Sequence, residues 1–108
     1  MLFVSIEDFY AKAASCRVLS RPEEWEYARR MKNGDAAARE ALIESYTPMV
    51  ARHVKHHCGH HETLGMALYC MQALERAVDA FDFCQDSETF AHRLSWYLRN
   101  ASVRYLVR

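Results

Sequence analysis

The spacing of hydrophobic residues predicts helices along most of the chain. Between Phe90 and Arg108, four apolar positions recur at spacings typical of one stripe of a helix: Leu94, Leu98, Ala101 and Tyr105. From about Leu64 to Phe81, apolar residues cover much of the helix circumference, which indicates a buried central helix. We find no run that alternates with period two between turn residues. The pattern therefore predicts an all-α bundle of about four to six helices.

Short local signals mark where these helices begin and end. Ser20 and Glu23 have the spacing of a capping box, and Pro22 stands in the first turn, where its missing N–H costs little. Asn33 and Gly34 form a typical helix terminator. We expect further N-caps at Asp35 and at either Ser87 or Thr89.

Two other helices are expected in the first half of the chain. The first runs from Ile6 to about Arg17. The second follows Asp35, and its apolar stripe includes Leu42. Pro48 lacks a backbone donor and its ring crowds the preceding turn, so we expect a kink or a break near Tyr46 and Thr47 before the helix resumes towards Gly59.

Composition limits the class of protein. At 108 residues and 51% hydrophobic content, the chain is expected to form one folded domain, in which residues 1–20 form an N-terminal helical segment and residues 21–108 a central domain. No segment suits a membrane span or a signal peptide. The scattered cysteines contain no CxxC pair: Cys16, Cys58, Cys70 and Cys84. These features favour a cytoplasmic protein with reduced thiols. We find no nucleophile–base pattern or phosphate loop, and expect neither an enzyme nor a cofactor.

The last helix carries candidate chemistry for nucleic acid beside its apolar stripe. Six residues lie to one side: Arg93, Trp96, Tyr97, Asn100, Val103 and Arg104. Aromatic rings stack on unpaired bases, arginines neutralise phosphates, and an amide can contact base edges. The chain is neutral, with 14 basic and 14 acidic residues, yet no carboxylate follows Glu88. The alternative is that the rings merely extend the core and the arginines face solvent.

Several segments, in order along the chain, resemble the sigma factors of bacterial RNA polymerase. Residues 23–35 (EEWEYARRMKNGD) and 38–44 (AREALIE) are similar to the entry helix, its glycine–aspartate turn and the next helix. Residues 76–82 (RAVDAFD) resemble the family's arginine-alanine-valine and phenylalanine-aspartate signature. Phe90 and residues 96–101 (WYLRNA) resemble the promoter-melting helix. The sequence from Ser5 to Tyr10 also resembles the segment that precedes the central domain in this family.

The resemblance implies roles in promoter opening. Trp96 and Tyr97 would wedge at the upstream edge of the melted DNA, and Asn100 and Val103 would face the upstream base pair of the minus-ten element. The candidate DNA-binding residues are Phe90, Arg93, Trp96, Tyr97, Arg99, Asn100, Val103 and Arg104. The implied partners are the clamp coiled coil of the largest subunit of the RNA polymerase core, the melted non-template strand of promoter DNA, and a regulatory protein such as an anti-sigma factor.

The chain departs from the family in its docking helix. Where the family has an aspartate, a glutamine and a glutamate that contact polymerase, this sequence has Gly65, Leu68 and Tyr69. With Gln72 and Glu75, these residues form the candidate partner-binding set. An apolar face suggests weaker polymerase binding or a different partner, so the alternative function is a sigma-like protein–protein interaction module or regulator that no longer binds promoter DNA. No C-terminal helix-turn-helix domain is expected within these 108 residues.

Histidines gather between the second and central helices. His53 and His57 have the four-residue spacing of one helix face, and Cys58 or His61 could complete a tetrahedral zinc site. No CxxC or HExxH pattern supports zinc, so we favour solvated histidines on an exposed loop. A milder functional hypothesis is that protonation below neutral pH adds positive charge near DNA.

Overall fold

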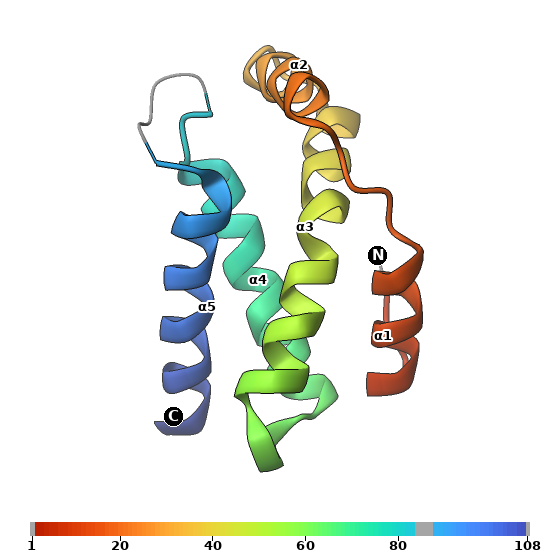
Figure 1. Cartoon of the computed structure of the whole chain (residues 1–108), viewed down its shortest axis with the longest axis vertical. Coiled ribbons are helices and arrows are strands. Elements are labelled where there is room, and N and C mark those ends of the chain that lie inside the picture. The colour runs from red at the N-terminus through yellow and green to blue at the C-terminus, as the bar shows by residue number, and fades with distance from the viewer. Residues whose placement is uncertain (1, 84–87, 108) are drawn as a thin grey trace.

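The computed structural model describes residues 2–83 and 88–107, and the regular structure in these ranges is helical (Figure 1). The helices are α1 (Ile6–Ser15), α2 (Arg21–Lys32), α3 (Ala36–His57), α4 (Leu64–Ala80) and α5 (Phe90–Val107), with a short 3₁₀ turn η1 (Gly59–His61). The predicted all-α bundle is confirmed. None of the helices in the described part of the chain combines the length and the apolar character needed to cross a bilayer.

The side chains that the sequence marks as caps begin the helices. Ser20 and Glu23 form the reciprocal capping box of α2. The Glu23 N–H donates to Ser20 Oγ at 3.3 Å, and the Ser20 N–H donates to Glu23 Oε1 at 3.0 Å. Gly34 ends the turn after α2 with a φ of +91°, a backbone conformation that favours glycine. Thr89 accepts a bond from the His92 N–H at 3.2 Å and starts α5, whereas Ser87 lies outside the described residues.

α3 is one helix of 22 residues that includes Pro48. Of the kink or break expected near Tyr46 and Thr47, the break is therefore wrong. Pro48 removes one hydrogen bond, but buried residues on both sides anchor the helix in the core. Val50 is fully buried just after the proline, and Thr47 just before it donates its hydroxyl to the Ile43 carbonyl at 2.9 Å. Tertiary packing of this kind stabilises helices more than local propensity does, which explains why one proline does not interrupt α3.

α4 is the central helix, and it packs against both α3 and α5 (Figure 1). Its eight buried residues form one broad face: Met66, Ala67, Cys70, Met71, Ala73, Leu74, Ala77 and Val78. The opposite side is exposed, so α4 is less widely apolar in its packing than the sequence pattern predicts. α1 lies against α3 and α4, and α2 packs across one end of α3. Each large apolar side chain buried in this way, such as Met66 or Leu74, contributes about 1.5–3 kcal/mol to folding. The core therefore forms around α4, and it leaves the outer side of α5 exposed.

Candidate nucleic-acid interface

Three buried residues fix the rotation of α5 about its axis. Leu94, Leu98 and Ala101 are at most 2% exposed and lie against the core. Because these residues point inward, Trp96 and Val103 point outward, and their side chains are 56% and 59% exposed. Exposure of a tryptophan and a valine on the same helix face is costly in water, so this face is a candidate binding surface.

The two adjacent aromatic residues differ in burial. The Trp96 indole is exposed, whereas Tyr97 is half-buried and packs against the hydrophobic core. Their ring centroids lie 5.6 Å apart in an edge-to-face arrangement, a geometry that adds stabilisation beyond area burial. Tyr97 therefore holds the indole in place, while Trp96 keeps an open ring face on which a base could stack.

The arginines on α5 differ in whether they already have an acidic partner. Arg93 donates from Nε to Glu88 at 2.6 Å. Arg99 and Arg104 are exposed and form no ion pair with any described residue. A guanidinium without a carboxylate can neutralise a phosphate without first breaking a bond. Of the predicted phosphate contacts, Arg99 and Arg104 are therefore better placed than Arg93.

A shallow hollow lies beside the indole. It measures about 300 Å³ and is lined by five residues: Glu88, His92, Arg93, Trp96 and Arg99. Glu88 is the one carboxylate in this lining, and Arg93 neutralises it. The hollow therefore combines an aromatic wall with a positive charge.

Asn100 is exposed, as expected for a residue that contacts bases. Its Nδ2 donates to the Trp96 carbonyl at 3.0 Å, one turn earlier in the helix. That bond leaves the side-chain oxygen without a partner among the described residues and orients the amide along the Trp96 side of α5. The amide can still accept one bond from a base edge.

The assignment of Phe90 to DNA contacts is wrong. Phe90 is 2% exposed, and its ring lies 4.6 Å from Tyr46, 5.3 Å from Phe81 and 5.0 Å from Phe83, centroid to centroid. This aromatic cluster closes the end of the bundle where α5 begins. Phe90 therefore anchors the first turn of α5 in the core and has no surface to offer a nucleotide.

The predicted partner-binding residues on α4 separate into two groups. Leu68 is 41% exposed, and Gln72 and Glu75 are exposed further along the same helix. Gly65 instead packs beneath Tyr105, because any Cβ at this position would overlap the tyrosine hydroxyl. The Tyr69 ring also packs edge-on against Tyr105, with 5.6 Å between ring centroids.

The end of α5 therefore packs beside the start of α4. Tyr105 contacts both Gly65 and Tyr69, yet Gly65 stays exposed and Tyr69 is half-buried, so their assignment as partner contacts stays a prediction. Leu68, Gln72 and Glu75 remain accessible.

The histidine cluster does not form the alternative zinc site. No three His, Cys, Asp or Glu side chains are placed to hold a metal ion within residues 2–83 and 88–107. His53 points towards α5 instead, where its Nε2 lies 2.7 Å from the Ser102 hydroxyl, and Cys58 is 3.7 Å from the same oxygen. His61 is exposed on η1.

The environment of His53 disfavours its charged form. Burial, and then the positive charges of His57 and Arg99, lower the pKa of His53 below its ordinary value. His53 is therefore a structural link between α3 and α5 that is neutral at neutral pH. Its pairing with Ser102, 49 residues away, has no signal in the sequence.

A scan of protein-family models finds no match to this chain, and a search of curated proteins finds none that is similar to it.

Proposed function

We propose that this domain is a sigma-like transcription initiation factor that binds melted promoter DNA through the outer face of α5 and RNA polymerase core through the outer face of α4. The observation that carries the proposal is the exposed Trp96 indole, supported by Tyr97 and accompanied by the guanidiniums of Arg99 and Arg104, which pair with no carboxylate among the described residues. The resemblance of residues 76–82 and 96–101 to sigma factors adds the promoter and polymerase context.

The physical basis for DNA binding is stacking combined with charge. Stacking of one base on an exposed aromatic ring contributes about 1–3 kcal/mol, and each neutralised phosphate makes binding more dependent on salt. An opened duplex presents unpaired bases, whereas a closed duplex hides them. The Trp96 face is therefore suited to the single strand, which makes the protein a stabiliser of open DNA.

The proposed polymerase contact centres on Leu68. This side chain is exposed on α4 and is accompanied by Gln72 and Glu75, so an apolar contact with a polar rim is available. Tyr105 lies beside Gly65, so a partner that reaches this end of α4 would also meet the tyrosine ring. The alternative function, a module that binds a regulatory protein and no DNA, would use this same face.

Capture of the domain by purified bacterial RNA polymerase core tests the function directly. We expect capture to fall in Leu68→Glu and to persist in Val18→Glu. Val18 is a matched control because it is a 67% exposed apolar residue in the linker between α1 and α2. We expect an open-promoter probe to increase capture, and Trp96→Ala to abolish that increase. Capture that ignores both the promoter probe and Trp96→Ala would favour the interaction module, and absence of capture would contradict the polymerase proposal.

A further inference from the structure

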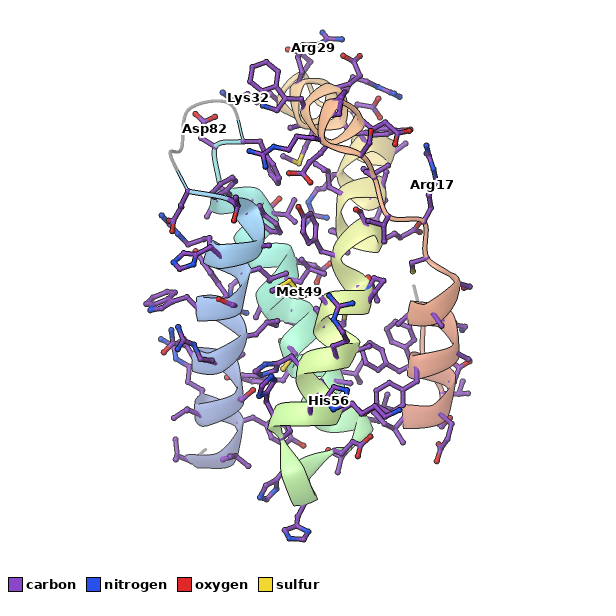
Figure 2. All side chains as sticks on the ribbon, in the orientation of Figure 1. Arg17, Arg29, Lys32, Met49, His56 and Asp82 are labelled. Carbon is purple, nitrogen blue, oxygen red and sulfur yellow. The ribbon has the colours of Figure 1, made fainter. Side chains whose placement is uncertain are left out.

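A second surface with affinity for anions lies between α3 and α5. The two helices pack mainly against α4 and touch each other little, so their outer flanks leave a groove of about 450 Å³. We call this the α3/α5 groove; its lining residues are Met49, Arg52, His53, His56, His57, Ser95 and Leu98. Figure 2 shows Met49 and His56 on the part of α3 that lies between α5 and α1.

The charges in the groove have one sign. Arg52 forms no ion pair with any described residue, and no carboxylate is among the lining residues. Most other arginines described in the fold, such as Arg29, Arg30 and Arg39, are paired with acidic side chains. An unpaired guanidinium next to imidazoles favours an anion, and an oxygen-rich anion such as phosphate can accept hydrogen bonds from both.

The apolar residues of the α3/α5 groove suit a sugar–phosphate chain better than a small ion. Met49 and Leu98 give the groove an apolar floor. Ser95 lines its α5 side, where the hydroxyl donates to the His92 carbonyl at 2.7 Å. The groove is an open trough rather than a closed pocket. A polymer that crosses it can place a phosphate at Arg52 and its less polar sugar over the methionine and leucine.

The groove continues towards Trp96. Ser95 lines the groove and precedes Trp96 in α5, and Arg99 lines the hollow at the indole while its charge acts on His53. One strand could therefore stack a base on Trp96 and direct its backbone into the groove. This continuity argues for single-stranded nucleic acid as the occupant.

The imidazoles make this contact sensitive to pH. His53 faces His57 on α3 and Arg99, Ser102 and Leu98 on α5, and its Nε2 is engaged with Ser102. The Cys58 and Cys70 thiols lie 3.7 and 3.9 Å from the same Ser102 hydroxyl. Lys55 lies over Tyr10 on the α1 side of α3 and does not line the groove. His56 and His57 are exposed at the groove, so a phosphate can reach their ring nitrogens.

We infer that the α3/α5 groove is a second nucleic-acid contact, in which Arg52, His56 and His57 hold a phosphodiester of the strand whose base stacks on Trp96. The inference rests on the proposed DNA-binding function and extends it to a surface outside the promoter-melting helix. Because a bound phosphate favours protonated imidazole, the strand binds more tightly as the pH falls.

The test measures anisotropy of a labelled single-stranded minus-ten oligonucleotide with the full chain, at about pH 8 and about pH 6. We expect the wild-type protein to bind about threefold to tenfold more tightly at the lower pH. The double variant His56→Gln, His57→Gln should lose this gain. The control variant His60→Gln, His61→Gln removes two exposed histidines of η1 outside the groove and should keep it.

A second pair of variants tests the arginine. Arg52→Gln should weaken binding at both pH values and lower the slope of log affinity against log salt by about one. Arg76→Gln, at an exposed arginine of α4 that forms no ion pair with a described residue, controls for the loss of one charge and should change the slope less. Circular dichroism of each variant verifies that the helices are intact.

The outcomes separate this inference from the function on which it rests. If the oligonucleotide quenches Trp96 but the groove variants bind like their controls, the groove inference is overturned and DNA binding stands. If the oligonucleotide does not bind, both are overturned. If inorganic phosphate alone shifts the NMR signals of His56 and His57 at lower concentration than the oligonucleotide does, the groove is a free-phosphate site and the strand contact is rejected.

Discussion

Tyr105, near the end of α5, lies directly over Gly65 at the start of α4, so closely that no side chain larger than hydrogen fits beneath its hydroxyl. The same ring packs against Tyr69 one turn further along α4. A glycine at position 65 thus admits a tyrosine from another helix. Packing within the domain accounts for the lack of a side chain at this position.

This relationship predicts a coupling between the two residues. Gly65→Ala should displace the Tyr105 ring and weaken its contact with Tyr69, at a cost of about 0.5–1.5 kcal/mol in the free energy of unfolding. In a Tyr105→Ala background the same change should be neutral or stabilising, because alanine favours helix more than glycine does. Urea denaturation of the four proteins in this cycle measures the coupling, and additive effects would contradict the packing account.

Two aromatic residues of α5 should respond differently to truncation. Phe90→Ala should lower the free energy of unfolding by about 3–5 kcal/mol, since Phe90 is buried among Tyr46, Phe81 and Phe83. Trp96→Ala should cost less than about 1 kcal/mol, since most of the indole is in solvent. Thermal and chemical denaturation compare the two variants. A large loss in Trp96→Ala would show that the indole supports the core and would remove it as a stacking surface.

Stability should depend on pH through His53. Because burial lowers the pKa of His53, the unfolded chain binds a proton that the folded chain resists. The contribution of His53 to stability is therefore complete above the ordinary histidine pKa and is lost as the pH falls below about 6.5. His53→Asn should flatten this part of the stability–pH curve relative to His60→Asn, a variant at an exposed histidine. Parallel stability–pH curves for the two variants would show that the lowered pKa of His53 does not contribute to the pH dependence of stability.

The arginines of α5 should differ in their contribution to DNA affinity. Arg99→Gln and Arg104→Gln should each reduce the salt dependence of oligonucleotide binding by about one counterion, because neither guanidinium has a described acidic partner. Arg93→Gln should have a smaller effect, since Arg93 is engaged with Glu88. Affinities at several salt concentrations give the slopes. A larger effect for Arg93 than for Arg99 would mean that Glu88 releases its partner on binding.

Local signals in the sequence predicted the helix ends well. The capping box of Ser20 and Glu23 and the turn at Gly34 depend on residues a few positions apart, so the sequence contains all the information they need. The stripe of Leu94, Leu98 and Ala101 was likewise sufficient to predict which side of α5 is buried. That stripe also placed Trp96 on the exposed side.

Features that depend on distant residues could not be predicted in this way. The burial of Phe90 depends on Tyr46, 44 positions earlier, and on Phe81 and Phe83. The spacing of residues within α5 contains no sign of these contacts, so it cannot exclude Phe90 from the DNA-binding set. α3 continues through Pro48 because of tertiary contacts that helix signals do not include. The α3/α5 groove arises from the packing of both helices on α4, so its combination of Arg52 with three histidines is visible only in the fold.

Trp96 fluorescence tests the central claim most directly, and Trp25 provides a matched reference. The two indoles are equally exposed, at 56%, but Trp25 lies on α2 and Trp96 on α5. In a Trp25→Phe protein, which retains Trp96, a single-stranded minus-ten oligonucleotide should quench the emission saturably, and the duplex form should quench it much less. In a Trp96→Phe protein, which retains Trp25, the same titration should leave the emission unchanged. Equal quenching of both indoles, or none of Trp96, would contradict a base-stacking role for α5.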